Sequence, residues 1–218
     1  NVKIDEKRIV SSTGVLELAK LPEKLVVIGA GYIGLELGTV WARLGAEVEV
    51  IEFLPRILPG MDEEVARKFM AIAKRQGLKF RVRTAVKSAK TRKKGVSLMV
   101  APADGGDEEQ INADVALVSV GRHPAITGLG LEEVGVAVSD RGRIKVDSRF
   151  ETSVEGIFAI GDVIDGPMLA HKAEEDGVAA VELMAGLAGH VDYNNVPSIV
   201  YTSPEVATLG KSEEGLKS

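Results

Sequence analysis

The chain has 218 residues, carries a formal net charge of −5 and contains no cysteine. That length is enough for one or two domains with a full hydrophobic core. The acidic balance gives no electrostatic case for nucleic acid or an anionic membrane as a partner, and no apolar run approaches the roughly 20 residues that span a bilayer. Without cysteine, the chain holds no disulfide, thiolate metal site or cysteine redox centre. We expect no metal site, because the only imidazoles, His123, His171 and His190, are not spaced as metal ligands.

An apolar run at residues 25–28 is typical of a buried strand, and it leads directly into a glycine-rich turn. Each glycine has a physical role in a dinucleotide-binding turn. Gly29 allows the sharp bend, Gly31 lets a pyrophosphate approach the backbone, and Gly34 lets the next helix pack closely on the sheet. The N-terminus of that helix offers free N–H groups to the phosphates. A further strand is predicted at residues 46–52, so the motif has the strand–turn–helix–strand context that it requires.

Glu52 ends this further strand, at about the 20-residue spacing expected for the acid that binds the adenosine ribose. Its carboxylate would accept hydrogen bonds from both ribose hydroxyls and repel a 2′-phosphate, and no cation follows before Arg56. The motif therefore favours NAD over NADP. On the residues alone two alternatives stay open. One is a glycine turn in an α/β protein that binds nothing, and the other is a methyltransferase turn, which also combines glycines with a later acid.

The periodicity then changes twice. A helix is predicted from Asp62, its expected N-cap, to Gly77. Its apolar face is expected to consist of Val65, Phe69, Ile72 and Ala73. From Lys79 the period becomes two, which predicts a small antiparallel excursion rather than a further βαβ repeat. A buried strand is predicted at residues 114–121, and the turn at residues 122–124 is expected to face the nicotinamide half of the cofactor.

The last part of the chain contains two predicted short strands, at residues 144–147 and 156–160. The second runs into Gly161 and Asp162, where a ligand hydroxyl could approach closely and bind the carboxylate; a plain turn is an equal alternative. A helix is predicted at residues 173–187. Its apolar lining is expected to be Val178, Val181, Leu183, Met184 and Leu187.

Taken together, several segments resemble the pyridine nucleotide–disulfide oxidoreductases, and most closely those members that oxidise dihydrolipoamide. The matching segments are residues 29–38, 52–59, 121–124, 152–162, 168–177 and 201–207. Their order along the chain is far more specific than any single motif, and the similarity covers essentially the whole chain. Ala125 departs from the asparagine often found there in the family, but the glycine and proline that carry the turn are present.

The resemblance implies two sets of cofactor-binding residues. The set for NAD(H) is Gly29, Gly31, Tyr32, Ile33, Gly34, Glu36, Glu52, Gly121 and Arg122. The set for FAD is Asp162, on the ribityl chain, and the backbone of Met168, Leu169, Ala170 and His171. Glu36 would be the carboxylate near nicotinamide and flavin, and so the candidate catalytic residue at the hydride-transfer site; a solvated helix glutamate is the alternative. Tyr32 would sit where some relatives have an aromatic lid over the flavin and others have an aliphatic residue. Lys172 matches the family's sequence in position, and an exposed side chain is the alternative.

In enzymes of this type dihydrolipoamide reduces a cysteine disulfide, the electrons pass to FAD, and NAD+ is reduced. The chain lacks the redox cysteines, the family's FAD-domain glycine turn and its His–Glu acid–base dyad. The resemblance therefore implies a catalytically incomplete piece of a longer flavoprotein that binds FAD weakly or not at all. The parent would form a homodimer and serve a 2-oxoacid dehydrogenase complex in the bacterial cytoplasm or the mitochondrial matrix.

Two alternatives to this function stay open. The first is a stand-alone, non-catalytic NAD(H)-binding module. The second is an NADPH-dependent reductase of the glutathione or mercuric type, against which Glu52 speaks.

The expected fold class is α/β, with a Rossmann-like NAD-binding domain that has a parallel sheet, helices and an antiparallel β-meander, followed by part of a second, FAD-contacting domain. The expected boundaries are residues 1–21 for a connector, 22–143 for the NAD-binding domain, 144–196 for the partial central domain and 197–218 for the start of an interface domain.

Overall fold

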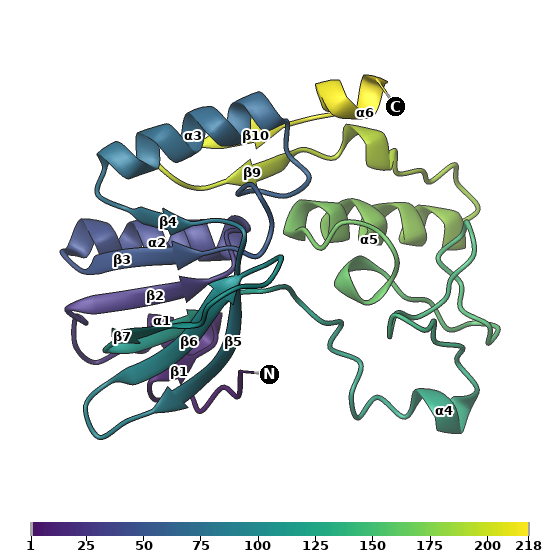
Figure 1. Cartoon of the computed structure of the whole chain (residues 1–218). Coiled ribbons are helices and arrows are strands. Elements are labelled where there is room, and N and C mark those ends of the chain that lie inside the picture. Colours follow the sequence, from purple (N-terminus) through teal and green to yellow (C-terminus); the bar gives the residue numbers. More distant parts are fainter. Residues whose placement is uncertain (1, 218) are drawn as a thin grey trace. The chain divides into compact units, whose positions relative to one another are not determined.

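The computed structural model describes residues 2–217, which form two compact units (Figure 1). The first unit comprises Asn1–Gly121 and Ile199–Ser218, and the second comprises Arg122–Ser198. The functional boundaries drawn from the sequence, after residues 143 and 196, stay a prediction. None of the helices among residues 2–217 is long and apolar enough to cross a membrane.

A five-stranded parallel sheet is the centre of the first unit, in the order β1-β8-β2-β3-β4. Its strands are β1 (Ile9–Val10), β2 (Lys24–Ile28), β3 (Glu47–Ile51), β4 (Lys79–Arg81) and β8 (Val115–Val118). Val27 of β2 pairs with Val50 on one side and Leu117 on the other. The last four residues of β2 and of β3 are all buried, as expected for a parallel sheet covered on both faces. The strand predicted at residues 25–28 is thereby confirmed.

Two long helices, α2 (Tyr32–Leu44) and α3 (Glu63–Arg75), connect successive strands of this sheet. The predicted ends are confirmed: the Asp62 side chain accepts from the first-turn N–H groups of α3, and Gly77 follows that helix with φ +100°. The expected apolar face of α3 is wrong in one respect, because Val65 is 38% exposed. The buried face consists of Ala66, Phe69 and Ala73.

Residues 84–113 form a separate antiparallel sheet in the order β5-β6-β7. Its strands are β5 (Thr84–Thr91), β6 (Val96–Pro102) and β7 (Glu109–Ala113). The antiparallel excursion is thus confirmed, but its expected start at Lys79 is wrong. Residues 79–81 form β4, which pairs in parallel with β3, so β3, α3 and β4 are a further βαβ unit. β4 is a short edge strand whose residues are exposed or partly buried, and its polar–apolar alternation in the sequence does not distinguish parallel from antiparallel pairing.

Both ends of the described chain contribute to the first unit. β1 pairs with β8, and between β1 and β2 lies a short helix, α1 (Ser12–Leu16), capped by the Ser11 side chain. Near the other end, Val200 and Val206 are buried in the hydrophobic core cluster that includes β2 and β3. The elements there are β9 (Ser198–Val200), β10 (Val206–Thr208) and α6 (Glu213–Lys217).

The second unit has little regular β-structure. Its elements are α4 (Leu131–Val134), the 3-10 turn η1 (Gly161–Val163), α5 (Ala170–Met184) and the 3-10 turn η2 (Tyr193–Asn195). The strands expected at residues 144–147 and 156–160 are wrong, because the segments make only isolated bridges such as Val146↔Thr152 and Glu151↔Phe158. Among the described residues of this unit, neither segment has a neighbouring strand with which it could complete a ladder.

The long helix of the second unit buries a different face from the one expected. Four of the five residues named for its apolar lining are exposed, namely Val178, Val181, Met184 and Leu187. The residues that α5 buries are Lys172, Asp176, Ala179 and Ala180. Charge pairing inside the unit, described below, explains why a lysine and an aspartate take the inward positions.

Candidate functional site

In the glycine-rich turn between β2 and α2, the space around each of the three glycines agrees with the role predicted for it. Gly29 has φ +102°, and a Cβ there would lie 2.6 Å from the Ser119 carbonyl oxygen. A Cβ on Gly34 would lie 2.1 Å from the Gly29 carbonyl oxygen, so helix and turn approach too closely for any side chain. A Cβ on Gly31 would meet nothing within 4 Å. The turn is therefore tight at its first and third glycines and open at its second.

The open glycine is also the N-cap of α2. Gly31 has extended backbone (φ −79°, ψ −172°) and provides no side-chain hydrogen bond to the helix, and the first turn contains no acidic residue. The N–H groups of Tyr32 and Ile33, at the first helical positions, lie where an α-helix has no internal partner for them. These N–H groups and the positive end of the helix dipole favour an anion over Gly31.

Glu52 lies directly after β3 and is 8% exposed. Its Oε2 accepts a 2.7 Å hydrogen bond from the Ala30 N–H, in the centre of the glycine turn, and its Oε1 accepts one of 2.8 Å from the Leu54 N–H. A carboxylate oxygen can accept more than one hydrogen bond, so both oxygens retain capacity for a ribose hydroxyl. The sequence pattern predicted the role of Glu52 at the ribose. It did not predict the hydrogen bond to the Ala30 N–H, because a backbone N–H is common to almost every residue type.

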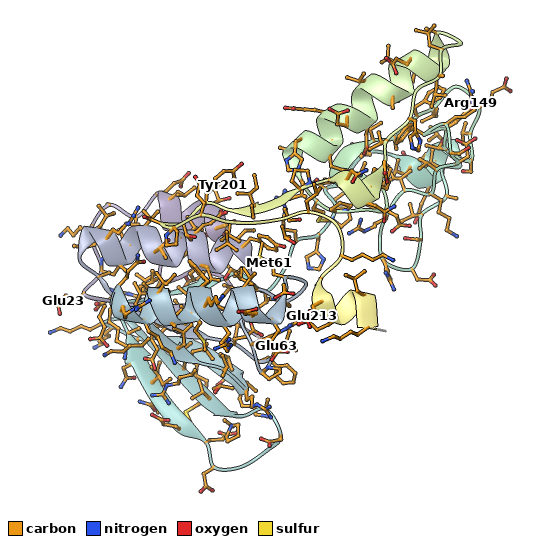
Figure 2. All side chains as sticks on the ribbon, turned by 90° about the horizontal axis from the view of Figure 1, so that it is seen from above. Glu23, Met61, Glu63, Arg149, Tyr201 and Glu213 are labelled. Atoms are coloured by element: carbon orange, nitrogen blue, oxygen red, sulfur yellow. The ribbon has the colours of Figure 1, made fainter. Side chains whose placement is uncertain are left out.

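Glu36 lies one turn into α2, on the same face as Tyr32 and partly buried. Its Oε1 accepts a 2.8 Å hydrogen bond from the backbone N–H of Tyr201. Figure 2 shows Tyr201 on the C-terminal segment beside this helix. The Tyr32 ring is partly buried against the core of the first unit. Neither candidate is therefore a freely solvated side chain of the helix.

Arg122 and Asp162, expected to bind different cofactors, are paired with each other in the second unit. The Arg122 guanidinium donates a 2.8 Å hydrogen bond to Oδ2 of Asp162, and both side chains are partly exposed. Gly121, which ends the longer of the two chain segments in the first unit, has φ +135°, and a Cβ there would meet nothing within 4 Å. The region around Gly121 is thus open, as the region over Gly31 is.

The residues expected to contact FAD all lie in the second unit. Asp162 is in η1, and Leu169 is the N-cap of α5 without a side-chain cap. His171, on the first turn of α5, has Nε2 at 2.7 Å from the Pro197 carbonyl oxygen. Because a carbonyl oxygen only accepts, Nε2 carries a proton and the ring is oriented by this contact. Met168 is partly buried and Ala170 is exposed, so the start of α5 is accessible.

The alternative of an exposed Lys172 is wrong, because its side chain is completely buried together with Asp176. Lys172 Nζ lies 2.7 Å from Asp176 Oδ2 and donates a 3.0 Å hydrogen bond to the Gly161 carbonyl oxygen. Asp176 in turn accepts from the Gly161 N–H at 2.9 Å and from the Tyr193 hydroxyl at 2.8 Å. Burial raises the pKa of the Tyr193 hydroxyl, and the hydrogen bond to the Asp176 carboxylate is a second, smaller cause in the same direction.

This buried cluster holds both backbone groups of Gly161, directly before Asp162. The sequence did contain one signal for it, since Lys172 and Asp176 are four residues apart and therefore neighbours on a helix.

Most of the chain matches a known protein family. Residues 2–177 match the family described as pyridine nucleotide-disulphide oxidoreductase. The chain belongs to this family. The resemblance noted in the sequence is thereby confirmed.

The relatives of this oxidoreductase chain are considerably longer than the chain itself. The mitochondrial dihydrolipoyl dehydrogenase of Pisum sativum is 57% identical over 216 residues, which cover 99% of this chain and 43% of that protein. Leghemoglobin reductase of Vigna unguiculata is 58% identical over 216 residues, with coverage of 99% and 41%. The chain thus spans less than half the length of these relatives.

Solved structures of similar proteins confirm the α/β fold class of this family member. LpdA from Mycobacterium tuberculosis is similar with a TM-score of 0.89 and 27% identity, over 99% of this chain and 46% of that one. The HOCl-induced flavoprotein disulfide reductase RclA from Escherichia coli is similar with a TM-score of 0.87 and 29% identity, over 97% and 48%. The expected Rossmann-like arrangement of parallel sheet, helices and antiparallel meander agrees with these neighbours.

Proposed function

We propose that this chain is the NAD(H)-binding part of a flavoprotein disulfide oxidoreductase, and that the whole enzyme oxidises dihydrolipoamide to lipoamide while reducing NAD+. The observation that carries the proposal is the open space over Gly31 at the uncapped N-terminus of α2, with the Glu52 carboxylate at the end of the adjacent strand. A dinucleotide requires these two features together, an anion site for its pyrophosphate and a carboxylate for its ribose.

Each NAD(H) residue then has a defined role. The pyrophosphate accepts hydrogen bonds from the N–H groups of Tyr32 and Ile33, and Gly31 leaves room for it. Glu52 accepts from the ribose hydroxyls while its bond to Ala30 keeps the turn in shape. Because this carboxylate would repel a 2′-phosphate, NAD(H) is preferred over NADP(H). The nicotinamide half lies toward Glu36 and Gly121 of the first unit.

The FAD site in this chain is partial. Asp162 is partly exposed, and its carboxylate can accept a ribityl hydroxyl, while the start of α5 at residues 168–171 approaches the flavin ring. Bound FAD supplies the electron transfer between a disulfide and the nicotinamide. The chain contains no cysteine, so that disulfide would come from residues outside these 218. We therefore expect FAD to bind this chain weakly or not at all.

We infer the substrate from the motifs that this chain shares with the family, because the degree of identity to its relatives does not determine it. Relatives at 57% and 58% identity are named dihydrolipoyl dehydrogenase and leghemoglobin reductase, so identity alone does not choose between the two. For the whole enzyme we propose dihydrolipoamide as substrate, a 2-oxoacid dehydrogenase complex as partner and a homodimer as assembly. Its compartment is the mitochondrion, as in the name of the Pisum sativum relative, or the bacterial cytoplasm.

Calorimetric titration of the chain with NADH, NADPH and FAD tests the proposal. We expect NADH to bind more tightly than NADPH and FAD to give no saturable binding. Gly31→Asp is the matched variant, because aspartate is a good N-cap and favours the helix dipole, yet its charge occupies the proposed pyrophosphate site. This variant should remain as stable as the unchanged chain and lose NADH binding. Unchanged NADH affinity in Gly31→Asp, or no NADH binding by the unchanged chain, would overturn the proposal.

A further inference from the structure

The hydrogen bond between Glu36 and Tyr201 joins helix α2 to a residue 165 positions further along the chain. The donor is the backbone N–H of Tyr201, and the acceptor is Oε1 of the Glu36 carboxylate at 2.8 Å. Among residues 2–217, no other group donates a hydrogen bond to this carboxylate. Oε2 therefore keeps its full acceptor capacity while the carboxylate is held in one orientation.

The backbone around Tyr201 is fixed by its two neighbours. Val200 is completely buried in the core of the first unit, and Thr202 is 9% exposed. The Thr202 N–H donates a 2.9 Å hydrogen bond to the Val200 carbonyl oxygen, which makes a three-residue turn centred on Tyr201. The Tyr201 side chain is 66% exposed. The segment thus presents a rigid N–H group to Glu36, and the phenol ring takes no part in holding the turn.

We propose that the Tyr201 backbone N–H is a positioning group for the nicotinamide end of the NAD(H) site. It orients the Glu36 carboxylate through Oε1 so that Oε2 can accept a hydrogen bond from the nicotinamide carboxamide. This inference rests on the proposed function, which supplies the role of Glu36. A glutamate side chain that is already ordered loses less conformational freedom when the ligand binds, so the ligand binds more tightly. Residues 199–203 would therefore belong to the NAD(H) site.

The turn geometry offers a variant that removes this donor without breaking the turn. Tyr201 is not among the residues with positive φ, so its turn is the inverse γ form, whose central φ of about −75° is close to the −65° of proline. Val200 belongs to β9, and extended backbone is what a residue before proline requires. Tyr201→Pro therefore fits the turn, deletes the N–H, and places a ring carbon where the hydrogen had been, which displaces the Glu36 carboxylate.

The experiment is a calorimetric comparison of NADH with ADP-ribose, which lacks the nicotinamide. For Tyr201→Pro we expect NADH affinity to fall about tenfold, as for loss of one charge-assisted hydrogen bond, while ADP-ribose affinity changes less than about twofold. Tyr201→Ala keeps the N–H and measures what the side chain contributes. Most of the tenfold loss of NADH affinity should therefore occur in Tyr201→Pro and be absent in Tyr201→Ala. In a Glu36→Ala background, Tyr201→Pro should change NADH affinity by less than about twofold.

Each other outcome overturns the inference in a distinct way. Equal losses for NADH and ADP-ribose would mean that the proline only disturbs the fold. Equal losses in Tyr201→Pro and Tyr201→Ala would assign the effect to the phenol ring. Unchanged NADH affinity in Tyr201→Pro would overturn the positioning role and leave the proposed function standing. If the unchanged chain bound neither ligand, the proposed function would fall and this inference with it.

Discussion

The carboxylate of Glu52 and the backbone N–H of Ala30 are joined by a 2.7 Å hydrogen bond, which ties the end of β3 to the centre of the glycine-rich turn. The other oxygen of Glu52 accepts from the Leu54 N–H at 2.8 Å. The acid therefore shapes the turn that it is also proposed to serve as a ribose acceptor, so its replacement should change stability as well as affinity.

The first prediction concerns the structural role of Glu52 beside its proposed role at the ribose. Glu52→Gln should lower the free energy of unfolding by about 1–3 kcal/mol, because the amide NH2 must then face one of two backbone N–H groups in a nearly buried site. Urea unfolding, followed by the fluorescence of Trp41 in the same unit, measures the change. Glu17→Gln, at an exposed position, is the control and should stay within about 0.5 kcal/mol of the unchanged chain. Equal effects of both changes would contradict the structural role of Glu52.

The second prediction compares two glycines one turn apart on α2. Gly34→Ala should destabilise the chain by about 1–3 kcal/mol or more, since the new Cβ would lie 2.1 Å from the Gly29 carbonyl oxygen and backbone would have to move. Gly38→Ala should stabilise it by up to about 1 kcal/mol, because its Cβ would meet Val27 and Val48 at 3.5 and 3.6 Å, which is ordinary contact, and alanine favours a helix interior. Thermal unfolding of both variants measures whether each is less or more stable than the unchanged chain. A shift of both variants in the same direction would contradict the assigned packing.

Local pattern was sufficient for the part of the fold that carries the glycine turn. The strand at residues 25–28, the helix after it and the Asp62 cap depend on neighbours in sequence, and the structure confirms them. Strand direction is different, because it depends on which strand lies alongside. Residues 79–81 alternate as an antiparallel strand would, and they pair in parallel with β3 because a helix returns the chain to that edge.

The failures in the second unit have tertiary causes. Residues 144–147 and 156–160 have strand composition, but a ladder requires a partner, and only isolated bridges form. Apolar content predicted Val181 and Met184 on the inner face of α5, yet the inner positions are taken by Lys172 and Asp176. Mutual charge pairing lowers the cost of burying these two side chains, and sequence hydrophobicity gives no account of that pairing.

Part of the candidate site could not be predicted from the sequence. The glycines and Glu52 were predicted because each role requires a specific residue type at a specific spacing. The Tyr201 contact to Glu36 uses a backbone N–H, which every residue except proline has, and it spans 165 positions. Only the three-dimensional path of the chain brings such a group to the helix.

The third prediction tests the buried pair on α5. Lys172→Met should lower the free energy of unfolding by about 3–5 kcal/mol, because it leaves the Asp176 carboxylate buried without its cation. The double variant Lys172→Met with Asp176→Leu should recover part of this loss, since no unpaired charge remains. Recovery should be incomplete, because Tyr193 and the backbone of Gly161 lose their partners.

Far-UV circular dichroism during urea unfolding follows the helix that carries this pair. Lys68→Met is the matched control, because Lys68 forms an exposed i, i+4 pair with Glu64 and its loss should cost less than about 1 kcal/mol. If Lys172→Met cost no more than Lys68→Met, the buried pair would contribute nothing to the fold.

The fourth prediction is a pH dependence that originates in the parallel sheet. Glu49 on β3 is nearly buried, and its carboxylate lies 3.0 Å from Lys24 Nζ on β2 and 2.5 Å from Arg81 Nε on β4. Burial raises the pKa of the Glu49 carboxyl, but hydrogen bonds and charge from Arg81 and Lys24 outweigh it, so the pKa is lowered from its ordinary value of 4.5. The folded chain therefore binds this proton less readily than the unfolded chain does.

Stability from Glu49 should accordingly be fully present above about pH 4.5 and be lost as the pH falls below that value toward the lowered pKa. Glu49→Gln, which cannot ionise, should be less stable than the unchanged chain at neutral pH, and the difference should shrink as the solution becomes more acidic than pH 4.5. Urea unfolding of both proteins across this range measures the difference directly, so other carboxyl groups that titrate in both proteins cancel. A difference that stayed constant or grew on acidification would show that the two cations do not hold Glu49 in its charged form.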